Sequence, residues 1–245
     1  MEQYIQERGS VTIEELCSYF GIHPNTARSD VQTLAEHGLV EKKYGKVIAA
    51  AQATTDYGER KQKNMDAKAQ IGIFAAPLLE ENDIVYMDAG TTVPHIFTCG
   101  APLPKRLTII TNSVEIVHWV TVNTDYTIFV LPGQIDRRLN SILSVETTES
   151  VKAYKFNKAI IGIRGISDKG ELLSSSGLDA RMKNIVLSMC DNVILMADSN
   201  KAGANNGIYS FSSLEKVKTW VCERSTSEIV NFCHEFNVTL ITNEA

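Results

Sequence analysis

The chain has 245 residues, 44% of them hydrophobic and 22% charged, and a formal net charge of −5 at pH 7. This length and apolar content are typical of a globular protein of one or two domains with a real core. The negative net charge does not indicate a nucleic-acid binder. Any basic feature is local, so nonspecific affinity for nucleic acid should be modest.

The sequence carries no signal for a metal, a disulfide or a membrane. The five cysteines are odd in number and scattered without a C-x-x-C pair, which argues against a disulfide scaffold and a zinc site. The five histidines lack metal-ligand spacing. No stretch matches a signal peptide or a bilayer-spanning apolar run, so we expect a cytoplasmic protein without cofactor, metal or membrane contact.

Residues 11–40 predict two short helices joined by a tight turn. Thr12, with Glu15 three residues later, predicts a capping box at the start of the first helix. Gly21 predicts the end of that helix, and Pro24 fits the first turn of the second one. At helical spacing, the apolar positions of the two helices are Ile13, Leu16 and Phe20, and Ala27, Val31 and Leu34.

The second of these helices has a polar face. Its short hydrogen-bonding groups and one guanidinium are typical of a recognition helix in a DNA major groove. A Lys-rich turn between two apolar pairs then predicts a β-hairpin wing against the phosphate backbone. The alternative is a small helical hairpin with a solvated polar face. The predicted DNA contacts are Asn25, Thr26, Arg28, Ser29, Gln32, Lys42, Lys43 and Lys46.

The rest of the chain divides into a linker and a larger domain. We predict a winged helix-turn-helix domain over residues 1–50, a polar linker over 51–65, and an α/β effector-binding and oligomerisation domain over 66–245. In the last, continuous apolar runs alternate with helical segments, which predicts a mostly parallel, Rossmann-like sheet covered on both faces. The predicted strands are 84–87, 107–110, 127–131, 159–163, 192–196, 217–221 and 238–241.

Three loops at predicted strand ends share small and hydroxyl side chains. They are DAGTT (88–92), TNS (111–113) and PG (132–133). Ligands of parallel sheets bind at the carboxyl ends of the strands, where N–H groups at helix starts suit a phosphate. Lys201, just past the fifth strand, adds a positive charge. The loops predict a site for a phosphorylated small ligand; the alternative is that they are only caps and turns.

Several longer motifs lie along the chain. They are the helix-turn-helix TIEELCSYFGIHPNTARSDV with the following LAEHGLV, then DAGTT, LTIITNS, KAIIGIRGISDKGELLSSSGLDARMKN and VILMADSNKAG. With these motifs the chain resembles transcriptional repressors of the DeoR family over nearly its whole length. The resemblance implies a DNA-bound regulator of sugar-catabolic genes. Its C-terminal domain would resemble ribose-5-phosphate isomerase and bind a phosphorylated sugar as inducer.

The resemblance also implies effector contacts, and the chain departs from the family at two of the candidate positions. Arg28 is followed by Ser29 where the family has two adjacent arginines, so one DNA contact is missing. Asp179 stands where the family usually has Glu, so one carboxylate arm is a methylene shorter. The implied effector contacts are Asp88, Gly90, Thr91, Thr92, Asn112, Ser113, Gly133, Asp179 and Lys201.

The expected function is repression of sugar or carbohydrate catabolic genes, relieved by a phosphorylated sugar. We expect a homo-oligomer, a dimer or a tetramer, that binds double-stranded operator DNA through two recognition helices. One alternative is a sugar-phosphate isomerase-like enzyme, because Asp88, Asp198 and Lys201 resemble a general acid–base set. Another is a DNA-binding protein whose C-terminal domain only oligomerises.

Overall fold

A computed structural model describes residues 1, 4–5, 8, 10–36, 40–43, 45–49 and 57–243. The chain forms two compact units, Met1–Thr55 and Asp56–Ala245, which we call the head and the sensor domain. Among the predicted features, the Lys43 side chain and residues 51–56 of the linker lie outside what the structure describes.

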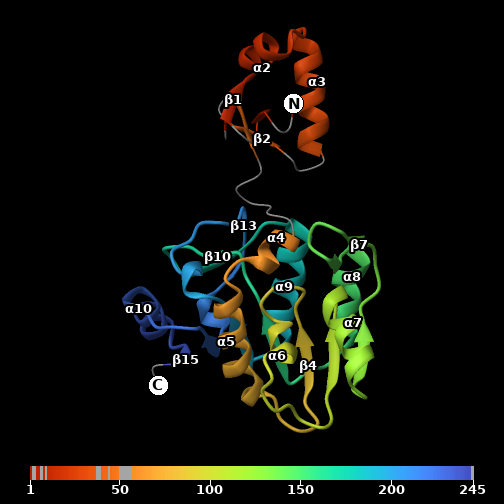
Figure 1. Cartoon of the computed structure of the whole chain (residues 1–245), viewed down its shortest axis with the longest axis vertical. Coiled ribbons are helices and arrows are strands. Elements are labelled where there is room, and N and C mark those ends of the chain that lie inside the picture. The colour runs from red at the N-terminus through yellow and green to blue at the C-terminus, as the bar shows by residue number, and fades with distance from the viewer. Residues whose placement is uncertain are drawn as a thin grey trace. The chain divides into compact units, whose positions relative to one another are not determined.

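The head is a winged helix-turn-helix, as predicted (Figure 1). Its three strands form an antiparallel sheet in the order β1-β3-β2. Two helices, α2 and α3, lie between the first and second of these strands in the chain. The elements are β1 (Ser10–Thr12), α2 (Ile13–Phe20), α3 (Pro24–Glu36), β2 (Val40–Lys43) and β3 (Lys46–Ala49).

The predicted capping box is present at the start of α2. The Glu15 N–H donates to Thr12 Oγ1 at 3.2 Å, and the Thr12 N–H donates to Glu15 Oε2 at 2.7 Å. Gly21 ends the helix in the left-handed conformation, at φ 63°. Local sequence signals therefore mark both ends of α2.

One apolar position of the head differs from the prediction. Leu16, Ala27 and Val31 are buried, but Phe20 is 37% exposed. The Phe20 ring packs edge-on against Tyr4 and Tyr19, at centroid distances of 5.5 and 4.9 Å. The buried stripe of α2 is therefore shorter than its periodicity indicates, and an aromatic cluster on the surface takes its last member.

The sensor domain is built on a seven-stranded parallel sheet, which confirms the predicted α/β class. The strand order is β15-β14-β12-β9-β4-β5-β6, so the direction of winding reverses between β4 and β9. Each strand overlaps one of the seven predicted apolar runs. The strands are β4 (Ile84–Met87), β5 (Thr108–Thr111), β6 (Thr127–Val130), β9 (Lys158–Ile161), β12 (Val193–Met196), β14 (Thr219–Val221) and β15 (Thr239–Ile241).

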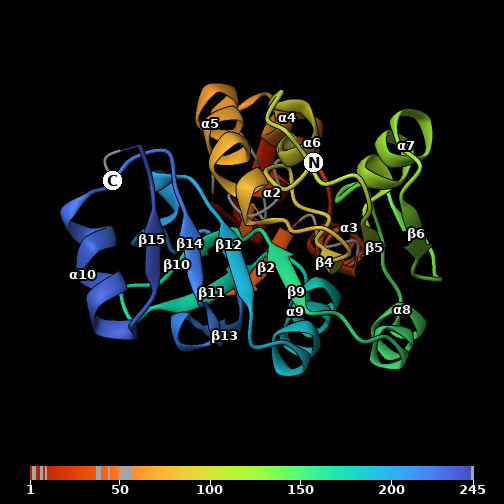
Figure 2. The same ribbon diagram turned by 90° about the horizontal axis from the view of Figure 1, so that it is seen from below.

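Helices cover both faces of this sheet (Figure 2). One face carries α5 (Met65–Ala75), α6 (His95–Thr98) and α7 (Val114–Asn123), and the other carries α8 (Val145–Ser150), α9 (Gly177–Met189) and α10 (Ser227–Phe236). Successive strand residues alternate between the two cores: Val85 and Met87 pack on the α5 side and Tyr86 on the α9 side. Continuous apolar strands are therefore buried on both faces.

Several short elements were not predicted. A helix, α4, occupies the second half of the predicted linker. Segments between the strands of the main sheet form two small antiparallel sheets, β7-β8 and β10-β11-β13. No helix within the described ranges is long and apolar enough to cross a membrane. Elements that were not predicted include α4 (Tyr57–Gln62), β7 (Ile135–Asp136), β8 (Ser141–Ile142), β10 (Gly165–Ile166), β11 (Glu171–Ser174) and β13 (Tyr209–Ser213). The structure also has the 3-10 turns η2 (Ala76–Leu78), η3 (Val151–Ala153), η4 (Ser199–Lys201) and η5 (Leu214–Lys216).

Candidate DNA-binding and effector sites

The polar face of α3 is exposed, as its sequence pattern requires. Ala27 and Val31 turn into the core of the head, which directs the polar positions between them outward. Arg28 Nη1 donates to Asn25 Oδ1 at 3.4 Å within this face. The exposed residues of α3 include all five predicted contacts, Asn25, Thr26, Arg28, Ser29 and Gln32.

The wing adds positive charge beside α3. Strands β2 and β3 pair in register, and Gly45 turns the hairpin at φ 75°, a left-handed conformation that glycine adopts without strain. Lys42 and Lys46 are exposed on the hairpin. Lys42 Nζ donates to Gln32 Oε1 at 2.6 Å, so the wing and the polar face of α3 form one continuous surface.

The sensor site begins where the winding of the sheet reverses. Asp88 directly follows β4 and Gly162 directly follows β9, and Asp88 Oδ2 accepts a hydrogen bond from the Gly162 N–H at 3.1 Å. A Cβ on Gly90 would lie 3.5 Å from the Gly162 Cα, so the two loops are in close contact. Ligands of open α/β sheets bind in the crevice at such a switch point.

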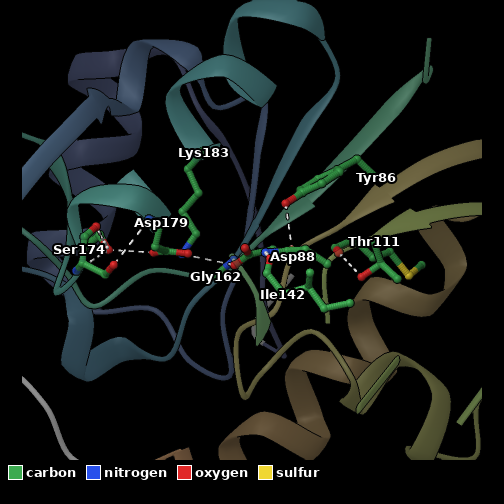
Figure 3. A network of polar contacts seen from close by, with 11 residues as sticks. Tyr86, Asp88, Thr111, Ile142, Gly162, Ser174, Asp179 and Lys183 are labelled. Atoms are coloured by element: carbon green, nitrogen blue, oxygen red, sulfur yellow. Dashed lines mark hydrogen bonds and ion pairs between the residues drawn. The ribbon is translucent and has the colours of Figure 1, made fainter. Parts of the chain in front are cut away.

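A buried polar network lies at this point (Figure 3). Lys183, from α9, places its Nζ 3.2 Å from Asp88 Oδ2 and 2.8 Å from Asp179 Oδ2. Ser174 Oγ donates to the same Asp179 oxygen at 2.6 Å. The structure thus joins two predicted site residues, Asp88 and Asp179, through Lys183. Lys183 itself was not predicted as a site residue. The available signal was the four-residue spacing of Asp179 and Lys183 on one helix.

The charges of this network act on one another in a dry environment. Burial raises the pKa of Asp88, an effect that Lys183 opposes and Asp179 reinforces. Burial acts to lower the pKa of Lys183, but the Asp179 and Asp88 carboxylates outweigh it and raise that pKa, so Lys183 stays an ammonium. Asp88 is 1% exposed, and its Oδ1 has no hydrogen-bond partner in the described part of the chain. A ligand hydroxyl would supply the missing donor.

The rest of the DAGTT loop offers hydrogen-bonding groups. Thr91 and Thr92 are buried, and their hydroxyls form no hydrogen bond with any residue that the structure describes. The Thr92 carbonyl accepts the His95 N–H at 3.1 Å and begins the single turn of α6. The loop therefore ends in a very short helix. The Thr91 and Thr92 hydroxyls are better placed to donate to a ligand than the N-terminus of that helix.

The TNS loop is occupied by contacts within the protein. Asn112 accepts from the Tyr86 hydroxyl at 3.1 Å and donates to the Ile142 carbonyl at 3.2 Å. Ser113 Oγ accepts the Ile116 N–H at 3.3 Å and caps α7. Neither residue is exposed. In this arrangement they hold the loop in place, and a direct contact with an effector stays a prediction.

Gly133 packs against the start of α8. A Cβ there would collide with Thr147 Oγ1 and would lie 2.8 Å from Ser144 Oγ, and φ is 143°. Glycine is therefore required for close approach of the backbone. The close contacts of Gly133 are with residues 142–147, and none of them joins it to the Asp88 network within the described part of the chain.

Lys201 lies in η4, just past β12, as predicted. Burial lowers its pKa, and the positive charges of Arg164 and Arg60 lower it further, against the effect of Asp198. Its ammonium forms no hydrogen bond or ion pair with the described residues. A partly buried cation without a counter-ion is a suitable partner for an anionic ligand.

Comparisons with known proteins agree with this arrangement. A model of the DeoR-like helix-turn-helix domain matches residues 1–53, and a model of the DeoR C terminal sensor domain matches residues 63–224. The chain is 27% identical over 240 residues to the HTH-type transcriptional regulator IolR of Bacillus subtilis, covering 97% of this chain and 95% of that protein. It is 26% identical over 204 residues to the glycerol-3-phosphate regulon repressor of Escherichia coli, covering 83% and 81%.

Solved structures are similar only at a distance. The full-length sorbitol operon regulator of Klebsiella pneumoniae is 13% identical, with a TM-score of 0.44 over 90% of this chain and 93% of that one. Ribose 5-phosphate isomerase of Methanocaldococcus jannaschii is 16% identical, with a TM-score of 0.41 over 57% and 55%. Similarities this distant do not indicate a function. The two family models together span both units, and the chain belongs to the DeoR family of transcriptional regulators.

Proposed function

We propose that this protein represses genes of sugar catabolism and is released from its operator by a phosphorylated sugar. The observation that carries the proposal is the pairing of an exposed recognition face with a sensor sheet whose switch point holds polar groups that have no partner among the described residues. The name of one relative, a glycerol-3-phosphate regulon repressor, is consistent with a phosphorylated effector.

At the operator, α3 enters the major groove and the wing follows the phosphate backbone. Arg28 is the side chain on α3 that suits a guanine edge, because guanidinium groups bind it in a bidentate manner. Lys42 and Lys46 neutralise phosphates, so operator affinity falls as salt rises. The other predicted contacts are Asn25, Thr26, Ser29, Gln32 and Lys43.

At the effector site, the sugar and the phosphate use different ends of the crevice. Asp88 Oδ1 accepts a sugar hydroxyl, and Asp179 holds Lys183 so that Asp88 keeps its orientation. The hydroxyls of Thr91 and Thr92 and the ammonium of Lys201 bind the phosphate. Gly90, Asn112, Ser113 and Gly133 shape the loops around the ligand.

We further propose a homo-oligomer that presents two heads to a repeated operator. The edge strand β6 supports this proposal: Phe129 and Val130 are 44% and 42% exposed on it. Exposed apolar groups on a sheet edge favour pairing with another copy.

The test measures operator binding and its release for two variants. A fragment of the protein's own promoter region is titrated with wild type, R28A and K201A, and each complex is then exposed to a panel of sugar phosphates. R28A should weaken specific binding by about 1–3 kcal/mol. K201A should bind operator normally and lose most of the response. R106A is the matched control, since Arg106 is exposed and paired with Glu81 in the sensor domain.

Three outcomes would count against the proposal. Loss of operator binding in K201A with an unchanged fold would assign Lys201 a different role. A panel that shifts neither the melting temperature nor the operator affinity would favour a sensor domain that only oligomerises. Turnover of a bound sugar phosphate, followed by NMR, would favour an enzyme.

A further inference from the structure

The loop that leads from β12 into η4 is held by the neighbouring strand β14. The two strands pair in parallel, with Met196 opposite Val221, so the segments that follow them start next to each other (Figure 2). Trp220 Nε1 donates to the Ala197 carbonyl at 3.0 Å, and Trp220 is fully buried. A side chain of β14 therefore sets the path of the chain as it leaves β12.

Glu223, just past β14, is bonded to the first residue of η4. Its carboxylate accepts the Ser199 N–H at 3.0 Å and the Ser199 hydroxyl at 2.5 Å. Cys222 Sγ donates to the same carboxylate at 3.3 Å, and Arg224 Nε donates to Ser199 Oγ at 2.8 Å. Ser199 begins η4 and Lys201 ends it, so Glu223 is bonded to the turn that carries the lysine.

Two more segments of the sensor domain contact the same turn. Asn64, which precedes α5, donates through Nδ2 to Asp198 Oδ1 at 3.2 Å, and Asp198 caps η4 by accepting the Asn200 N–H at 3.3 Å. Beyond η4, Gly203 lies so close to Glu228, in the first turn of α10, that a Cβ would collide with Glu228 Oε1. Residues from three separate parts of the chain therefore hold η4.

The Glu223 carboxylate fixes a geometry as well as a contact. Glu223 is 9% exposed, and a buried carboxylate is unfavourable unless hydrogen-bond donors surround it. Two of its donors belong to one residue, Ser199, and such paired bonds fix the direction of approach as well as the distance. These bonds are therefore satisfied together in one position of η4.

We propose that Glu223 is a positioning residue for the effector: through Ser199 it holds η4 so that the Lys201 ammonium is in place before the phosphate binds. Lys201 is half-buried, which restricts its rotamers, so its ammonium moves when the turn moves. This inference rests on the proposed function, in which Lys201 binds the phosphate. It adds a carboxylate that never touches the effector and raises affinity, because the ligand does not have to order the turn.

The test measures binding of inorganic phosphate to the full-length protein by calorimetry, with chloride at equal ionic strength as the reference. E223A should weaken phosphate binding about tenfold, because loss of the Ser199 bonds lets η4 take several positions. E223Q should restore most of the affinity, since a glutamine oxygen still accepts from Ser199. Thermal unfolding measures the stability of each variant separately.

A double-mutant cycle distinguishes positioning from a general effect on the fold. Its probe is the sugar phosphate of the panel that binds wild type most tightly. In the K201A background E223A should change the affinity little, because the group that Glu223 positions is gone. E171A is the matched control: Glu171 Oε2 accepts from Ser167 Oγ at 2.9 Å, so this variant also loses a bond between a serine and a glutamate. It should leave phosphate affinity unchanged.

The outcomes separate this inference from the proposed function. If E223A binds phosphate as wild type does, or weakens binding equally in the K201A background, the positioning role is overturned and the effector site stands. If E223Q binds as weakly as E223A, or E171A weakens binding as much, the role of the Ser199 bonds is overturned. If neither phosphate nor any sugar phosphate binds wild type, the proposed function itself fails, and this inference fails with it.

Discussion

Two buried aspartates lie at opposite ends of the same pair of strands, β4 and β9. At the amino end, Asp83 Oδ1 accepts from Asn157 at 2.6 Å, and Asp83 Oδ2 accepts from Lys158 and from the Glu80 N–H, both at 2.7 Å. At the carboxyl end, Asp88 Oδ1 has no partner among the described residues. A fully bonded carboxylate stabilises the fold, whereas an unfilled one is available to a ligand.

This contrast predicts different effects for two similar substitutions. Burial acts to raise the pKa of Asp83, but hydrogen bonds from Lys158 and Asn157 outweigh it and hold the pKa below its ordinary value. A depressed pKa stabilises the folded state above the unfolded value of about 4, and this stabilisation is lost as pH falls through the folded pKa. D83N should lower the free energy of unfolding by about 3 kcal/mol at pH 7. Urea denaturation at pH 7 and pH 3 measures both effects.

D88N serves as the comparison at the other end of the strands. Burial raises the pKa of Asp88, so its charge is disfavoured in the folded state and replacing it should cost much less than D83N. We expect D88N to lose the rise in melting temperature that a sugar phosphate causes in wild type. Equal destabilisation by D83N and D88N, or an unchanged pH profile for D83N, would contradict the different roles assigned to the two residues.

At the scale of elements, the strands of the main sheet could be predicted, whereas the strands of the small antiparallel sheets could not. The strands of the main sheet are buried on both faces, so each leaves a continuous apolar run in the sequence. α4 has one buried apolar residue, Tyr57, and is held by contacts with residues distant in sequence, such as Glu115 and Arg138. Such a helix leaves no apolar periodicity in the sequence, so residues 51–65 were predicted as linker.

The residues of the candidate site also divide into those that could be predicted and those that could not. Loops after predicted strands located Asp88 and Lys201, because the carboxyl ends of parallel strands share one edge. Lys183 was missed because an acid and a lysine four residues apart are usually a solvated surface pair. Burial of Lys183 depends on how α9 packs over β4 and β9, and the sequence of α9 alone does not contain that information.

The capping box of α2 is a local device, and its effect should be confined to the head. T12A removes the side chain that accepts the Glu15 N–H and should destabilise the head by about 1 kcal/mol. S18A, at an exposed position inside α2, is the control and should be neutral or slightly stabilising. Thermal unfolding followed by circular dichroism measures both, and an effect of T12A equal to that of S18A would contradict the role of the cap.

At the scale of the whole molecule, operator affinity depends on how many heads are joined. The head and the sensor domain have separate cores. A single head has one recognition helix and a few basic residues, in a chain with a net charge of −5. Linking two heads makes the second contact intramolecular and raises affinity without new contacts. The proposed homo-oligomer would therefore supply the affinity that a single head of this composition lacks at physiological salt.

A variant at the exposed edge strand should therefore lose operator affinity together with the oligomer. F129K places a charge on β6 and should block pairing between copies, because lysine on a sheet edge opposes association. Light scattering should show a lower mass than wild type, and affinity for an operator with two half-sites should fall by about 10²–10⁴ while a single half-site is bound as before. V230K, on α10 beyond the opposite edge of the sheet, is the control. An unchanged mass for F129K would place the interface elsewhere; an unchanged operator affinity with a reduced mass would show that one head suffices.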